Sequence, residues 1–141
     1  MIEIINRQKK YWINKNRFRS LLRRLMDHYQ QNHAEVTLAF VTNRIIKDLN
    51  RKFLKKDKPT DVLSFPIREK GADGKYYLGD IIISAHQAFL GCMKKNHGLE
   101  TELQILTIHG FLHLIGLEHE KGMEEEEQKI RDLLIEEQHG N

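Results

Sequence analysis

The stretch Leu78-Gly79-Asp80-Ile81-Ile82-Ile83-Ser84 decides the fold class, because it carries three consecutive isoleucines. A strand with one solvated face alternates apolar and polar residues, whereas a strand covered on both faces reads as an apolar run. The stretch therefore predicts an internal strand of a sheet. Before it, Asp73-Gly74 favours a turn. The turn follows a short β-prone run, Thr60 to Pro66, which we expect to end at its proline.

Strands and helices alternate on both sides of this pair. Strands are predicted by Ile2 to Ile5 and by the alternating apolar residues of Val36 to Val41. Helices are predicted by apolar residues at three-and-four spacing over Phe18 to Tyr29, over a segment capped by Asn43, over Ala85 to Asn96, over Leu99 to Ile115 and over Met123 to Glu137. We therefore expect one α+β domain over residues 1–141, with a small mixed sheet of about four strands covered by helices.

Composition places the chain among ordinary globular proteins. Of its 141 residues, 40% are apolar and 30% are charged. No apolar run approaches the roughly 18–20 residues that a membrane-spanning helix needs, so no membrane partner is expected. The single cysteine, Cys92, cannot form an internal disulfide, and we expect a reducing, cytoplasmic location.

The net charge of +3 conceals an asymmetry between the two halves of the chain. Residues 1–58 carry 15 Lys and Arg against 5 Asp and Glu, whereas residues 59–141 carry 8 against 15. A basic half is compatible with a polyanionic partner such as nucleic acid. The alternative is that the basic side chains, including Arg17, Arg19, Arg23 and Arg24, are the solvated faces of amphipathic helices.

Three histidines lie within the segment HGFLHLIGLEH: His109, His113 and His119. On a helix, His109 and His113 lie on one face, one turn apart, where both rings can reach a single ion. Gly116 is a natural helix end and lets the chain bring His119 to the same ion from another direction. Three nitrogens leave a fourth coordination position open, as in a catalytic zinc site.

The spacing equals the metallopeptidase pattern HExxHxxGxxH, except that Gly110 replaces the glutamate that acts as general base. Peptidase activity is therefore disfavoured. Hydrolysis remains compatible with the pattern, because a zinc ion acidifies its bound water. Glu118 and Glu120 flank His119 and are candidates to supply a carboxylate, but they are at least as well explained as solvated loop charges.

Taken with LNRKFLKKDKPTDVLSFP (49–66) and LGDIIIS (78–84), the segment HGFLHLIGLEH resembles the YbeY endoribonucleases of bacteria. The resemblance implies a zincin-like metal-binding helix and one zinc ion per chain, held by His109, His113 and His119. It also implies cleavage of single-stranded RNA, maturation of the 3′ end of small-subunit ribosomal RNA, ribosome quality control and the small ribosomal subunit as a partner.

Two positions depart from the family pattern. Leu54 stands where the family has an arginine that is thought to meet the RNA phosphate, and Glu118 stands where it has an aspartate. The nearby Lys55, Lys56 and Lys58 are candidates for binding substrate in place of that arginine. The catalytic group stays unassigned, and its candidates are a zinc-bound water and the side chains of Lys55, Lys56 and Glu118. Attack by this water and attack by the ribose 2′-hydroxyl both remain open.

Three functions are compatible with these residues. The first is a zinc-dependent endoribonuclease. The second is a zinc-stabilised module that binds RNA or the ribosome with little turnover, which the replacement of the family arginine by Leu54 favours. The third is a metallopeptidase, which Gly110 disfavours.

Overall fold

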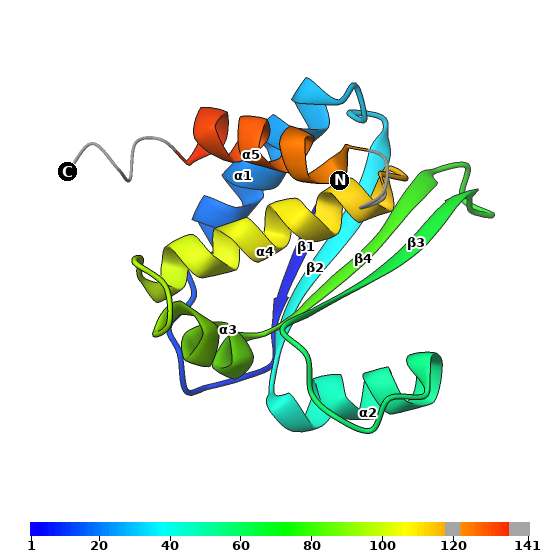
Figure 1. The fold of residues 1–141 in the computed structure, drawn as a ribbon. Helices are drawn as coiled ribbons and strands as arrows, with labels where there is room; N and C mark the ends of the chain where they lie inside the picture. The colour runs from blue at the N-terminus through cyan, green and yellow to red at the C-terminus, as the bar shows by residue number, and fades with distance from the viewer. Residues whose placement is uncertain (118–121, 136–141) are drawn as a thin grey trace.

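The computed structural model describes residues 1–117 and 122–135, which are built around a four-stranded sheet (Figure 1). The strands are β1 (Ile2–Asn6), β2 (Ala34–Val41), β3 (Val62–Lys70) and β4 (Tyr76–Ser84), in the spatial order β1-β2-β4-β3. β1, β2 and β4 are parallel, and β3 pairs with β4 in the antiparallel direction. The expected mixed sheet is confirmed, and the three isoleucines do mark an internal strand.

Helices cover the two faces of the sheet unequally. The helices are α1 (Lys15–His28), α2 (Asn43–Leu54), α3 (Ala85–Cys92), α4 (Leu99–Leu114) and α5 (Met123–Leu134). Figure 1 shows α1, α4 and α5 on one side of the sheet and α2 on the other. On the α2 side, a small cluster of Ala39, Val41, Ile46 and Leu63 is buried. No helix in the described ranges is long and apolar enough to cross a membrane.

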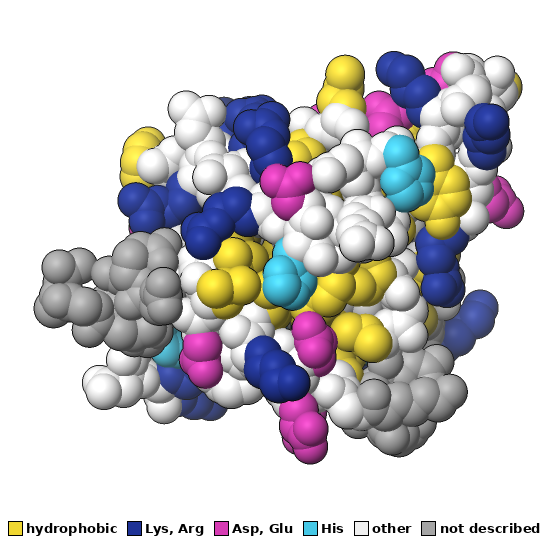
Figure 2. Space-filling view, turned by 90° about the horizontal axis from the view of Figure 1, so that it is seen from above, with side chains coloured by type: hydrophobic (Ala, Val, Ile, Leu, Met, Phe, Trp, Pro, Cys, Tyr) yellow, Lys and Arg dark blue, Asp and Glu magenta, His cyan; other side chains and the backbone are white. Residues whose placement is uncertain are grey.

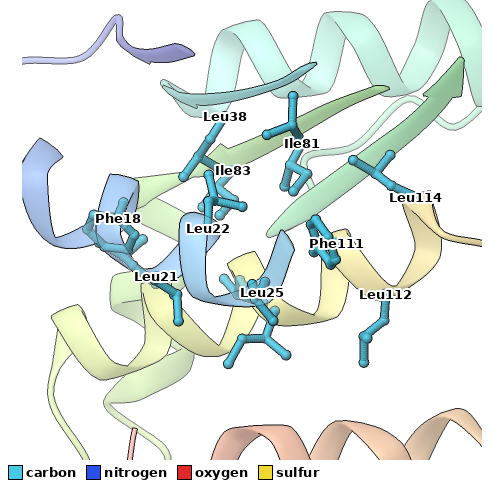
Figure 3. Close-up of a cluster of buried hydrophobic side chains, with 14 of the residues drawn as sticks. Phe18, Leu21, Leu22, Leu25, Leu38, Ile81, Ile83, Phe111, Leu112 and Leu114 are labelled. Atoms are coloured by element: carbon cyan, nitrogen blue, oxygen red, sulfur yellow. The ribbon is translucent and has the colours of Figure 1, made fainter. Parts of the chain in front are cut away.

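The main core lies between the sheet and helices α1 and α4. Figure 3 shows side chains from α1, from the inner strands and from α4 converging on one volume. Its fully buried members include Phe18, Leu22, Leu25, Leu38, Ile81, Ile83, Ile108 and Phe111. Helix α4 is apolar on nearly all sides because the sheet, α1, α3 and α5 surround it. The burial of α4 fixes the position of its last turn, where the histidines lie.

Strand β3 runs beyond its expected end. The sequence predicted a stop at Pro66, whereas the strand continues to Lys70 and its register shifts between Pro66 and Glu69. The prediction was wrong because β3 is an edge strand, where a proline removes no ladder hydrogen bond that a neighbour needs. The turn at Gly74, with φ +84°, joins β3 to β4 as expected.

Two helix ends also differ from prediction. Thr42, not Asn43, caps α2, because the Thr42 hydroxyl accepts the Ile45 N–H. The Asn43 side chain instead accepts a 2.6 Å hydrogen bond from the hydroxyl of Ser84, which caps α3. Helix α3 ends at Cys92, short of the predicted Asn96, because the N–H groups of Lys94 and Lys95 bond carbonyls three residues back. For α5, residues 136 and 137 of the predicted helix lie outside the described residues.

Candidate metal centre

The last turn of α4 presents His109 and His113 side by side. Their Nε2 atoms are 3.2 Å apart, and the two rings meet at 73° with centroids 4.7 Å apart. Their spacing of four residues places them on one helix face. The predicted pairing of these two rings is therefore present in the structure.

Gly116 ends the helix directly beyond the two rings. The Gly116 N–H bonds the carbonyl of His113, and the Leu117 N–H bonds the carbonyl of Leu112, which is the Schellman arrangement. This end requires a left-handed residue, and Gly116 has φ +96°. The predicted helix stop is confirmed, and it lets the chain leave α4 beside the histidines.

The two described histidines fit a zinc ion. Two nitrogen ligands about 2.1 Å from a tetrahedral zinc ion lie about 3.4 Å apart, close to the observed Nε2 separation. His119 and Glu118 lie outside the described residues. Within 1–117 and 122–135, no group of three or more potential ligands gathers. The set of three histidines thus stays a prediction, with two of its members in place.

Glu127 of α5 contacts the His109 ring at Nδ1, the nitrogen that does not face His113. Its Oε1 lies 2.7 Å from Nδ1 of His109, and the Glu127 side chain is only 16% exposed. A carboxylate accepts here, so Nδ1 is the donor and Nε2 is directed toward His113. A carboxylate on the far nitrogen is the usual support of a metal-binding histidine.

The pattern of apolar residues along α5 is a sequence signal for the buried position of Glu127, which the sequence analysis missed. Met123, Ile130 and Leu134 form the buried face of α5, and Glu127 occupies the same face, four residues after Met123 and three before Ile130. An acid on an otherwise apolar face indicates a buried partner. Within the run Glu124 to Glu127, residue identity alone does not distinguish the glutamate on the buried face.

A second contact fixes α5 against α1. The Tyr29 hydroxyl donates a 2.6 Å hydrogen bond to Glu126, and burial, together with this carboxylate, raises the pKa of Tyr29. The hydrogen bond ties the residue that follows α1 to the helix that carries Glu127.

A pocket of about 490 Å³ opens beside the two histidines. Its lining comes from β3, from the end of α4 and from the last residue of α2: Val62, Leu63, Ser64, Pro66, Arg68, His109, His113, Gly116, Leu117 and Leu54. Sequence reasoning missed Arg68, because the predicted strand ended at Pro66. Leu54, the departure from the family pattern, does line this pocket.

The three candidate lysines lie next to this pocket. Lys56 and Lys58 line a neighbouring pocket of about 700 Å³, which shares Leu54, Val62 and Leu63 with the first. Lys55 is the left-handed C-cap of α2, with φ +60°. Contact between these lysines and a substrate stays a prediction.

Gly110 faces the sheet, away from the pair of Nε2 atoms. A Cβ atom at this position would lie 2.6 Å from Cγ2 of Ile81, and the Ser64 hydroxyl donates a 3.3 Å hydrogen bond to the Gly110 carbonyl. The helix approaches the sheet so closely here that a glutamate has no room. This packing agrees with the expectation that the peptidase base is absent.

Two acids of the neighbouring sequence motifs, Asp61 and Asp80, do not line the histidine pocket. Asp80 sits on the α2 side of the sheet, beside Glu3 and Thr37, where burial and the Glu3 charge raise its pKa. Asp61 lines the pocket of Lys56 and Lys58. Ser64, by contrast, does line the histidine pocket.

The basic residues of α1 lie on another part of the surface. Figure 2 looks onto the α1 and α5 side and shows lysines and arginines at several places on this face, with acids interspersed among them. Arg17 pairs with Glu100 at 3.5 Å, and Arg19 donates to Asn16. None of the four arginines lines the histidine pocket. Their binding of nucleic acid stays a prediction.

Comparison with known proteins gives a consistent result. A family model described as Endoribonuclease YbeY matches residues 3–137. Curated proteins of that description include one from Oceanobacillus iheyensis, 43% identical over 123 residues (78% of this chain, 79% of the relative). Another, from Aquifex aeolicus, is 37% identical over 130 residues (92% and 85%).

A solved structure extends the similarity to the fold. The solution structure of TM1509 from Thermotoga maritima matches with a TM-score of 0.68 and 28% sequence identity. The match covers 100% of this chain and 93% of that one. The described elements therefore follow an established architecture over the length of the match.

Proposed function

Because the chain belongs to the endoribonuclease YbeY family, we propose that it cleaves single-stranded RNA with one zinc ion held by His109, His113 and His119. Membership makes the chain a nuclease. The metal, the form of RNA and the ligand set are the proposal. The observation that carries the proposal is the pair of Nε2 atoms 3.2 Å apart, with Glu127 behind one of them.

Each residue of the described site has a distinct task. His109 and His113 bind the ion through Nε2, and Glu127 holds the His109 ring in the orientation that permits this. When bound, zinc polarises a phosphoryl oxygen and acidifies water. In this proposal the phosphodiester binds in the pocket that opens beside the two rings.

Two exposed apolar side chains at the end of α2, of which Leu54 lines the pocket, favour an unpaired strand. Phe53 is 55% exposed and stands edge-on to Phe65, with ring centroids 5.4 Å apart. Its neighbour Leu54, 50% exposed, lines the pocket itself. A splayed base stacks on an exposed aromatic ring, whereas a base inside a duplex cannot. This geometry supports single-stranded RNA as the substrate.

The resemblance to YbeY proteins supports a biological setting as well. We propose that the chain acts in the cytoplasm on ribosomal RNA, maturing the 3′ end of the small-subunit RNA and removing defective ribosomes, with the small ribosomal subunit as partner. A precursor RNA that carries the 3′ extension is then the substrate to compare with unrelated single strands.

The test compares three substrates and three proteins. Zinc-loaded wild type, His113→Ala and His97→Ala are incubated with a labelled single-stranded RNA, the same RNA in a duplex, and casein. We expect wild type and His97→Ala to cut the single strand and His113→Ala to be inactive. Binding of RNA without cleavage by wild type would favour the binding module, and cleavage of casein would favour a peptidase.

A further inference from the structure

Arg68 is the charged residue that β3 contributes to the histidine pocket. Along β3, Ser64 and Pro66 line this pocket, and Arg68 is the next residue on the same face. Ile67, between them, points to the opposite side, where it lines a pocket with Glu3 and Asp80. The Arg68 side chain therefore borders the same pocket as the histidines.

The backbone at Arg68 is unusual for an arginine. Its φ is +49°, and it lies within the register shift between Pro66 and Glu69. One more residue of β3 than of β4 is accommodated there, which is a β-bulge. A left-handed residue other than glycine carries a conformational cost. Bulges near active sites commonly direct a side chain.

The guanidinium group reaches the end of α4. A Cβ atom placed on Gly116 would lie 3.0 Å from Nη1 of Arg68. The guanidinium thus lies against the backbone of Gly116, three residues beyond His113. Gly116 lacks a side chain that would push the guanidinium away, so the glycine serves both the helix end and the position of Arg68.

The charge of Arg68 is available to a ligand. Among the described residues, no carboxylate forms an ion pair with it, although Arg17 and Arg51 each have such a partner. It is also the one lysine or arginine in the described lining of the histidine pocket. A planar guanidinium binds two oxygens of a phosphate at once.

We propose that Arg68 binds the phosphodiester that lies in the histidine pocket, donating to its non-bridging oxygens. This inference rests on the proposed function, because it takes RNA as the substrate. It assigns the cation of the pocket to β3 and not to the lysine-rich loop 55–59. It also explains how a chain with Leu54 at the rim still presents a cation to the phosphate.

The test uses Arg68→Ala, Arg68→Lys and the matched control Lys70→Ala. Lys70 is exposed, lies on the same strand and does not line the pocket. The first readout is the zinc content, which we expect to be unchanged in all three. The second is the slope of log affinity against log salt for a single-stranded RNA oligonucleotide. The third is the rate of single-turnover cleavage.

We expect Arg68→Ala to reduce the salt slope by about 0.7, the value for one phosphate contact on a single strand. We expect its cleavage to fall on the order of a hundredfold. Arg68→Lys should keep the slope but recover only part of the rate, since an ammonium lacks the two-pronged geometry. Lys70→Ala should match wild type in cleavage.

The outcomes separate the two proposals. If Arg68→Ala and Lys70→Ala behave alike in slope and rate, the assignment of Arg68 is overturned while RNA cleavage stands. If wild type binds RNA with an Arg68-dependent slope but does not cut it, the proposed function fails and the phosphate site stands. If wild type binds no RNA, both are overturned.

Discussion

Two histidine–carboxylate contacts lie at opposite ends of helix α4 and have nearly the same length. At the start, His97 Nε2 lies 2.6 Å from Glu102; at the end, His109 Nδ1 lies 2.7 Å from Glu127. At the first contact the carboxylate is 1% exposed, and its other oxygen accepts from Lys95 at 2.8 Å. At the second contact, the far nitrogen of the histidine faces another histidine and a pocket.

The difference shows that a contact between a histidine and a carboxylate does not by itself define a functional site. Around Glu102, both oxygens have partners, so the contact ties the loop before α4 to the helix. Around His109, the carboxylate directs a ring nitrogen outward. We therefore interpret the first contact as structural and the second as support for a metal ligand. Variants of His113, Glu127 and Glu102 test this distinction.

The largest effect is expected at the C-terminal end of α4, where the histidines face the pocket. His113→Ala leaves two of the proposed three ligands, so zinc should fall from about one ion per chain to nearly none by elemental analysis. His97→Ala should keep its zinc. Loss of zinc should also lower the Tm of His113→Ala, because metal bound only by the folded state stabilises it. Full occupancy in His113→Ala would contradict the assignment.

The next effect concerns the carboxylate behind the ligand. Glu127→Gln should weaken zinc affinity by about 10–100-fold, as expected when the support of a metal-binding histidine is lost. Competition with a fluorescent chelator measures this affinity. Glu102→Gln, at the contact with His97, should bind zinc as tightly as wild type. Equal affinities for the two variants would remove the distinction between the contacts.

At the start of α4, where Glu102 contacts His97, we expect an effect on the stability of the fold. Glu102→Ala deprives Lys95 and His97 of their shared partner and leaves space beneath them. We expect a loss of about 1–3 kcal/mol in the free energy of unfolding, measured with denaturant on zinc-loaded protein. The rate of RNA cleavage per folded molecule should not change. A fall in that rate would show that the contact between His97 and Glu102 also serves the reaction.

The smallest effect is expected for a carboxylate with no histidine partner. Burial and the charge of Glu3 raise the pKa of Asp80. The folded state then holds the proton more tightly than the unfolded state, so this stabilisation is present below the unfolded pKa of about 3.9 and is lost as pH rises through the folded value.

Asp80→Asn removes this dependence on pH. We expect the variant to be more stable than wild type by a few tenths of a kcal/mol at pH 7, because the group is only partly buried. Unfolding with denaturant at pH 4 and pH 7 measures the difference, which should be smaller at pH 4. A larger advantage at pH 4 would reverse the sign of our argument.

The sequence predicted the parts of this site that depend on local periodicity. The three isoleucines marked the internal strand, the spacing of His109 and His113 placed both rings on one helix face, and Gly116 marked the helix end. Each of these depends on residues within one or two turns of the chain. Local rules are therefore sufficient for the pair and for the turn that follows it.

The parts that were missed depend on contacts between distant segments. Glu127 meets His109 only because α5 folds back on α4, and the acidic run hid its position on the buried face. Arg68 enters the pocket only because β3 continues past Pro66, which an edge strand allows and an internal strand does not. Which strand lies at the edge is a property of the sheet and not of the local sequence.

The most direct test of the central claim is the zinc dependence of RNA cleavage in single turnovers. Wild type and His113→Ala are stripped with a chelator and titrated with zinc against one labelled single-stranded RNA. We predict that stripped wild type is inactive, that cleavage returns in full at about one zinc per chain, and that His113→Ala does not recover. Equal cleavage by stripped and zinc-loaded wild type, or recovery of His113→Ala, would contradict the claim that this pair of histidines forms the metal centre of the nuclease.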